Sequence, residues 1–178
     1  MSTTRDADPV KLICSLFSPR QDLLETVTAR LVGMFGPLDW TSAELFFDRT
    51  RYYEKEMGGP LFRRFVSFAS LIRPEFIVEV KLQTNELERT FVQGGNRSVN
   101  IDPGYICLER LVLVTGKNYT HRIYLSKGIY ADLALVFNKG RFRALEWTYR
   151  DYADEGLITE FNQIRAKYKS QLESGGRP

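Results

Sequence analysis

VKLICSLFSPRQDLLETVTARLVGMFGP, residues 10–37, is the stretch that decides the predicted fold. Residues 10–17 form a short apolar run, which is typical of a buried strand. Ser18, Pro19 and Gln21 then fit the N-cap, N1 and N3 positions of a helix, as in a capping box. The apolar residues of this helix share one face: Leu23, Leu24, Val27, Leu31 and Met34. Because Gly36 and Pro37 end the pattern, the chain is predicted to begin with a strand and a helix.

Two further strands and a second helix follow. Residues 39–48 and 61–71 are predicted strands, separated by a turn at residues 58–60. The second helix is predicted from residue 72 to residue 91 or 92, with Gly94 and Gly95 capping it. Residues 76–82 also alternate apolar with polar side chains, so a strand is the alternative there.

The C-terminal half consists of short apolar runs and a last helix. Strands are predicted at residues 99–101, 111–114, 121–125, 129–137 and 142–147, with a hairpin loop at residues 138–140, and the helix at about residues 153–172. Strand, helix, strand, strand, helix, strand is the ferredoxin-like order. The predicted fold class is therefore α+β, with a ferredoxin-like βαββαβ order extended by C-terminal antiparallel strands and a terminal helix.

Length and composition suit one globular domain. The chain has 178 residues, of which 43% are apolar and 26% charged, close to the globular average. Residues 10–172 are predicted to form a single α+β domain, with a flexible N-terminus at residues 1–9 and a frayed C-terminus at residues 173–178. The run at residues 10–17 is too short to span a membrane. Cys14 and Cys107 are expected to be reduced, buried thiols of a cytoplasmic protein without a zinc site.

The charge balance permits an anionic ligand. The net charge is +3, and residues 61–125 alone carry nine basic and six acidic side chains. This bias falls short of the dense Lys and Arg footprint of a dedicated duplex binder. Aromatic residues make up 13% of the chain, which suits stacking surfaces as well as a core.

Polar side chains share one face of the second predicted helix. Lys81, Thr84, Asn85 and Glu88 stand at i, i+3, i+4 and i+7, so an amine, a hydroxyl, an amide and a carboxylate point the same way. Two interpretations are open: an ordinary solvent face with weak helical pairs, or one wall of a site.

The sharpest candidate site follows this helix. Lys117, His121 and Arg122 combine a point charge, a side chain that titrates near neutrality and a planar bidentate donor. Together with Arg97 they could hold a phosphate or a carboxylate, with His121 as acid or base; a purely structural histidine is the alternative. Residues 100–105, NIDPGY, fit a tight turn leaving a strand, in which Asp102 could also bind a cation or orient a base.

The candidate residues divide into two groups. The candidate catalytic residues are His121, Asp102 and Glu88. The candidate ligand-binding residues are Arg97, Asn100, Lys117, Arg122, Lys81, Asn85, Tyr52, Glu56, Tyr124 and Tyr130. Residues 147–152 either wall the same cleft or, more simply, seal the sheet against the last helix.

Several standard motifs are absent from the sequence. No GxxxxGK[ST], GxGxxG or GxSxG motif occurs, so a P-loop NTPase is excluded. No motif indicates a particular cofactor, metal, reaction or oligomeric state.

Six blocks in a fixed order carry a resemblance. Residues 50–58, 81–88, 100–105, 117–125, 128–131 and 147–152 together resemble an uncharacterised bacterial family, a domain of unknown function, over about residues 10–168. Members are sometimes labelled GTP-binding proteins, so the resemblance implies that GTP is a candidate ligand. Arg150 stands where a proline is expected in relatives, so the backbone at that turn is expected to differ.

Three functions follow as hypotheses. The leading one is a protein that binds a phosphorylated small molecule or nucleotide, with GTP as one candidate, in a basic and polar cleft without a P-loop. The second is a single-stranded RNA binder with exposed Tyr and Phe as stacking platforms on the sheet, although no RNP1-like strand is visible. The third is a protein-interaction scaffold. No membrane partner is expected.

Overall fold

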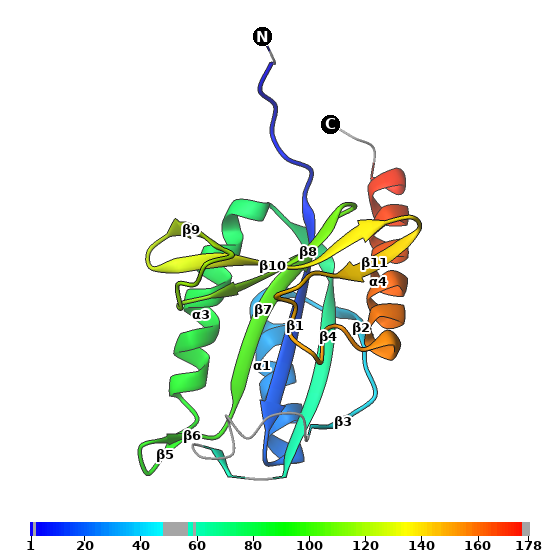
Figure 1. Ribbon diagram of the computed structural model, residues 1–178. Helices are drawn as coiled ribbons and strands as arrows, with labels where there is room; N and C mark the ends of the chain where they lie inside the picture. The colour runs from blue at the N-terminus through cyan, green and yellow to red at the C-terminus, as the bar shows by residue number, and fades with distance from the viewer. Residues whose placement is uncertain (2, 48–56, 59, 176–178) are drawn as a thin grey trace.

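The computed structural model describes residues 1, 3–47, 57–58 and 60–175 (Figure 1). The helices are α1 (Gln21–Phe35), the 3-10 turn η1 (Pro74–Phe76), α3 (Ile77–Arg89) and α4 (Glu155–Ser174). The strands are β1 (Val10–Ser18), β2 (Leu38–Thr41), β3 (Leu45–Phe47), β4 (Leu61–Ile72), β5 (Val92–Gln93), β6 (Asn96–Arg97), β7 (Asn100–Ile106), β8 (Arg110–Thr115), β9 (Arg122–Ser126), β10 (Ile129–Asn138) and β11 (Arg141–Ala144).

One antiparallel sheet organises the molecule. Its strand order is β11-β10-β8-β7-β1-β4-β2, with β3 paired to β4 and β9 paired to β10. The strands β7, β1, β4 and β2 belong to the predicted ferredoxin-like order, and β8, β10 and β11 extend the sheet beyond β7 (Figure 1). The predicted α+β class, the antiparallel extension and the C-terminal helix are confirmed.

Helices cover both faces of the central strands. On β1, Leu12 and Leu16 belong to an apolar core shared with α1 and α3. Ile13 belongs to a second core that contains Phe161 and Ile164 of α4. Successive residues of a strand point to opposite faces, so β1 is buried on both sides, and this explains its continuous apolar run.

The first helix begins later than the capping pattern predicts. α1 begins at Gln21, and its N-cap residue Arg20 makes no side-chain capping bond. Ser18 belongs to β1, where its hydroxyl accepts from Arg20 N–H at 3.1 Å and donates to Ser98 O at 2.8 Å. The hydroxyl that was expected to cap the helix therefore fixes the end of the strand instead.

Three other predicted element boundaries differ from those in the structure. The expected strand at residues 39–48 is interrupted between β2 and β3, where Ser42 N–H donates to Phe65 O. Gly94 and Gly95 do not cap α3; with φ angles of 59° and 85° they form the turn between β5 and β6. β11 ends at Ala144 rather than at residue 147, because Thr148 bonds to Leu145 N–H and Ala134 O and bends the chain.

Other predictions hold. Residues 77–89 are helical, so the alternative strand at residues 76–82 is wrong. Lys139 and Gly140 have φ angles of 51° and 82°, as expected for a tight hairpin loop. α4 is capped by Asp154, which accepts from Gly156 N–H at 3.0 Å and Leu157 N–H at 3.3 Å. In the part of the chain that the structure describes, no helix is both long and apolar enough to cross a membrane.

Candidate functional site

β7 and β8 pair at one end and separate at the other. Their pairing runs only from Ile106 opposite Leu111 to Gly104 opposite Leu113. Beyond that point β7 stays paired with β1 as far as Asn100, and β8 stays paired with β10 as far as Thr115. The two strands therefore diverge and leave a gap in the middle of the sheet, which we call the β7–β8 gap.

Pro103 and Gly104 explain where the gap begins. In a strand, every second residue directs its backbone N–H to the same edge. Ile101 and Cys107 both direct their N–H groups away from β1, so the backbone nitrogen of Pro103, two residues after Ile101, faces that same edge. Proline has no N–H to donate, and the ladder to β8 ends there. A Cβ on Gly104 would lie 2.4 Å from Val112 O, so only glycine allows the strands to meet at this point.

The predicted turn at residues 100–105 is therefore wrong. These residues form most of β7 and are paired with β1 throughout. Proline is tolerated within this strand because its missing donor falls on the edge that has no partner strand.

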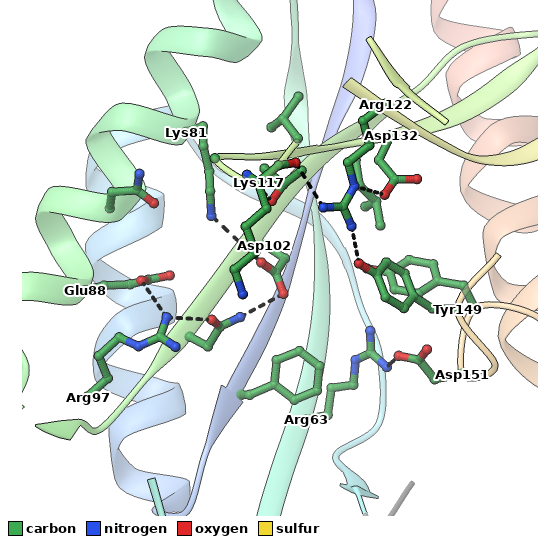
Figure 2. A pocket seen from close by; sticks show the side chains of 18 of the residues that line it. Arg63, Lys81, Glu88, Arg97, Asp102, Lys117, Arg122, Asp132, Tyr149 and Asp151 are labelled. Atoms are coloured by element: carbon green, nitrogen blue, oxygen red, sulfur yellow. Dashed lines mark hydrogen bonds and ion pairs between the residues drawn. The ribbon is translucent and has the colours of Figure 1, made fainter. Parts of the chain in front are cut away.

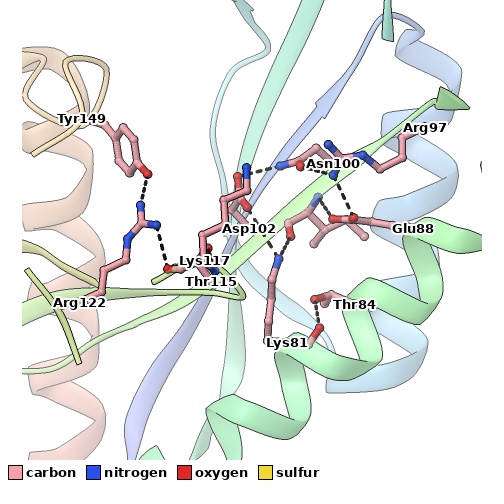
Figure 3. Close-up of polar contacts among 11 residues, drawn as sticks. Lys81, Thr84, Glu88, Arg97, Asn100, Asp102, Thr115, Lys117, Arg122 and Tyr149 are labelled. Atoms are coloured by element: carbon pink, nitrogen blue, oxygen red, sulfur yellow. Dashed lines mark hydrogen bonds and ion pairs between the residues drawn. The ribbon is translucent and has the colours of Figure 1, made fainter. Parts of the chain in front are cut away.

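Two charged side chains of α3 occupy the free edge of β7 (Figure 3). Ile101 N–H donates to Glu88 Oε1 at 2.6 Å, and Lys81 Nζ donates to Ile101 O at 2.9 Å. Lys81 and Glu88 are each only 7% exposed, so this face of α3 is not the solvent face that the first interpretation supposed. The pair satisfies backbone groups that a strand would otherwise bind.

The β7–β8 gap opens into a cavity of about 800 Å³ (Figure 2). One side, which we call the α3–β7 wall, carries Lys81, Asn85, Glu88, Arg97, Asn100 and Asp102. The other side, which we call the opposite wall, carries Thr115, Lys117, Arg122, Asp132, Tyr149, Arg150 and Asp151, together with Arg63 of β4, whose guanidinium is paired with Asp151. The α3–β7 wall comes from residues 81–102, and the opposite wall comes from Arg63 and residues 115–151.

The α3–β7 wall is a continuous polar network (Figure 3). Arg97 Nη1 lies 3.5 Å from Glu88 Oε2 and donates to Asn100 Oδ1 at 3.0 Å. Asn100 Nδ2 donates to Asp102 Oδ2 at 2.7 Å, and Lys81 Nζ lies 3.8 Å from Asp102 Oδ1. Burial raises the pKa of Glu88, while Lys81 and the N–H of Ile101 act in the opposite direction.

On the opposite wall, Arg122 is held by three bonds (Figure 2). Its Nε donates to Asp132 Oδ2 at 2.9 Å, its Nη1 to Lys117 O at 3.0 Å and its Nη2 to Tyr149 Oη at 2.6 Å. Burial raises the pKa of Tyr149, so its hydroxyl is neutral near pH 7. The guanidinium thus has one fixed orientation at the edge of the cavity.

Arg63 is the most deeply buried cation of the opposite wall. Its side chain is 3% exposed and forms an ion pair with Asp151, and its Nε donates to Ser15 Oγ at 2.9 Å. The guanidinium carbon lies 4.4 Å from the ring centre of Phe17 and 4.1 Å from that of Phe65. Cation–π contacts of this kind compensate part of the desolvation of the charge.

Comparison with known proteins identifies the family of this chain. Residues 8–168 match the family model described as Domain of unknown function (DUF4416). The chain belongs to this family. No curated protein and no solved structure matches the chain significantly. The match confirms the resemblance to a domain of unknown function over nearly the range that the six sequence blocks indicated.

In this DUF4416 protein most of the candidate residues converge. Lys81, Asn85, Glu88, Arg97, Asn100, Asp102, Lys117 and Arg122 all line the cavity. His121 lies outside the lining, stacked on Trp147 at 5.3 Å between ring centres, with Nε2 3.3 Å from Asp132 Oδ2. Its contact with the cavity lining is the one with Asp132 Oδ2.

Two of the candidate tyrosines, Tyr124 and Tyr130, do not join this group. Tyr124 and Tyr130 contact each other at 5.3 Å between ring centres and do not line the cavity. Tyr52 and Glu56 lie outside the residues that the structure describes.

Sequence reasoning missed two charged residues of the cavity lining. Asp132 is the single charged residue of β10, and Arg63 stands beside Arg64 in the otherwise apolar and hydroxyl-bearing β4; both are almost fully buried, Arg63 at 2% and Asp132 at 3% exposure. A charged residue at an inward-facing strand position is rare unless it is paired. Its presence in an apolar strand is the sequence signal that could have identified these two residues. Tyr149 and Asp151 line the cavity, while Tyr152 packs on Phe65, so residues 147–152 both wall the cleft and seal the core.

The described cysteines and acidic residues do not show the pattern of a metal centre. Among the described residues, no three His, Cys, Asp or Glu side chains are grouped to hold a metal ion. Both cysteines are free thiols. Cys14 is buried as expected, and its pKa is raised to about 12 by desolvation, whereas Cys107 is only half-buried.

Proposed function

We propose that this protein binds a phosphorylated small molecule or nucleotide in the cavity at the β7–β8 gap. One observation carries the proposal: Lys and Arg outnumber Asp and Glu by six to four in the lining of a single cavity. A cavity of about 800 Å³ falls within the range of about 300–1,000 Å³ that is usual for small-molecule sites. A nucleotide such as GTP, which the family resemblance implies, is of suitable size.

The arginine geometry supports an anionic ligand. Arg122 is anchored by Asp132 and Tyr149, so little rotamer freedom is lost when it binds a further acceptor. Arginine and lysine form strong, charge-assisted hydrogen bonds with phosphate oxygens. Phosphate recognition here would depend on side chains, since the sequence contains no P-loop.

Two features bear on the wider setting. Free thiols at Cys14 and Cys107 support a cytoplasmic location, where thiols stay reduced. Single-stranded RNA has less support than a small molecule, because α1, α3 and α4 pack on the faces of the central strands that would serve as stacking platforms.

The test is isothermal titration calorimetry with inorganic phosphate, ribose 5-phosphate and GTP, each with and without magnesium. The variant K117Q/R150Q removes two cations from the cavity lining. The control R30Q/K139Q removes two exposed cations that do not line it. A hydrogen bond to a charged group contributes about 1.5–3 kcal/mol, so losing one or both contacts should weaken binding at least about tenfold.

The control variant should bind as the wild type does. Wild-type protein that binds none of the phosphorylated ligands would refute the proposal, and so would equal affinity in K117Q/R150Q and wild type.

A further inference from the structure

The net charge of the cavity is confined to one wall. The α3–β7 wall carries two cations, Lys81 and Arg97, and two carboxylates, Glu88 and Asp102. The opposite wall, with Arg63 counted beside its partner Asp151, carries four cations and two carboxylates, so the excess of positive charge belongs to that wall. A phosphate group is attracted to the opposite wall, whereas the α3–β7 wall is electrically balanced.

Asp102 is the carboxylate that a ligand can reach. Its side chain is 34% exposed, against 9% for Glu88, 4% for Asp132 and 19% for Asp151. Glu88 is already engaged with Ile101 N–H and Arg97, and Asp132 with Arg122. Asp102 is therefore the most exposed of the four carboxylates that line the cavity.

The position of Asp102 is fixed in advance of binding. Its backbone pairs with Ser15 of β1. Its Oδ2 accepts from Asn100, and its Oδ1 lies 3.8 Å from Lys81 Nζ (Figure 3). A carboxylate has about four lone-pair positions, so the hydrogen bond from Asn100 leaves acceptor capacity for a ligand. A fixed carboxylate is suited to accept from two adjacent hydroxyls and repels a phosphate.

We propose that the ligand is a phosphate ester that also carries adjacent hydroxyl groups, such as a sugar phosphate or a nucleotide with both ribose hydroxyls. Its phosphate binds the opposite wall, and its hydroxyls donate to Asp102 across the β7–β8 gap. This inference rests on the proposed function, because it assigns an orientation to the same ligand. Asp102 acts in it as the residue that determines specificity.

The first experiment needs no variant. Wild-type protein is titrated by calorimetry with GTP and with 2′,3′-dideoxy-GTP, and separately with ribose 5-phosphate and inorganic phosphate. The hydroxyl-bearing ligand of each pair should bind at least about tenfold more tightly, since each hydroxyl forms a hydrogen bond to a charged group. The two pairs also distinguish the source of the hydroxyls, a nucleotide or a simple sugar phosphate.

The second experiment changes Asp102 itself. In Asp102→Asn the preference for GTP over its dideoxy analogue should fall from about tenfold to nearly none. The matched control Glu86→Gln removes one negative charge from the exposed side of α3 and should keep the full preference.

The outcomes separate the two proposals. Tight binding of phosphates with no preference for hydroxyls in the wild type would overturn the role of Asp102 and leave the proposed function standing. Binding of no phosphorylated ligand would overturn both. If Asp102→Asn does not fold, the wild-type comparison alone decides the matter.

Discussion

Gly104 is the position at which the strand geometry of the gap can be tested most sharply. In Gly104→Ala the new Cβ would lie 2.4 Å from Val112 O, 2.9 Å from Leu113 Cδ2 and 3.2 Å from Leu113 Cα. A carbon approaches a carbonyl oxygen to about 3.3 Å, so β7 and β8 would have to separate by about 1 Å. Two of the three close atoms are backbone and cannot rotate away.

The expected cost is at the upper end of the range for overpacking. Inserting a methyl group into a tightly packed site costs about 1–3 kcal/mol, and here the short β7–β8 ladder would be strained as well. We expect Gly104→Ala to lower the free energy of unfolding by at least about 2 kcal/mol. With a urea m-value of about 2 kcal/mol/M, the midpoint should fall by about 1 M.

Gly116→Ala is the matched control. Gly116 has open space around it, with the nearest atom 4.0 Å from an added Cβ, and its φ is not positive. Its replacement should change the free energy of unfolding by no more than about 0.5 kcal/mol. Equal midpoints for Gly104→Ala and the wild type in urea denaturation would refute the close approach of the two strands.

Three further predictions concern other parts of the molecule. Burial raises the pKa of Glu88, so its contribution to stability is fully present below its unfolded-state pKa and is lost as pH rises through the raised pKa. Urea denaturation from pH 4 to pH 7 should therefore show the wild type losing stability relative to Glu88→Gln. A difference that stays constant over this range would contradict the prediction. Asp154→Ala should cost about 1 kcal/mol in the same assay through loss of the α4 cap, and an unchanged midpoint would count against the cap. Iodoacetamide at pH 8 should modify Cys107 before Cys14, since Cys14 is fully buried with a pKa raised to about 12; mass spectrometry showing early labelling of Cys14 would oppose this.

Much of the fold was predictable because its signals are local. The apolar run of β1, the helical spacing of α1 and the loop at Lys139 and Gly140 each depend on neighbouring residues. The boundaries were less predictable because tertiary bonds set them. Ser18 is the clearest case, since its hydroxyl bonds to Ser98, eighty residues away, instead of capping the helix.

The candidate site was predictable as a set of residues but not as a shape. Lys81, Glu88, Arg97 and Asp102 were identified by type and spacing, and they converge on one wall. The β7–β8 gap could not be found this way, because it depends on which strands pair at each end of β7. Pro103 inside a strand is the one local sign of it, and the pattern around it is equally typical of a turn.

The role of the only histidine illustrates the same limit of local patterns. His121 stands one residue before Arg122, yet Arg122 points into the cavity while His121 stacks on Trp147. Sequence proximity to a cavity residue therefore does not place a side chain in the cavity. His121 lies in the turn before β9, and although both side chains approach Asp132 Oδ2, Arg122 lines the cavity and His121 does not.

Binding of a phosphate ester at the β7–β8 gap is tested most directly by a ¹H–¹⁵N NMR titration with ribose 5-phosphate. The amide signals of residues 100–102 and 104 on β7, of residues 115–117 at the end of β8 and of residues 149–151 should shift together and saturate with one dissociation constant. Shifts confined to other surfaces, or no shifts at millimolar ligand, would contradict a binding site in the gap.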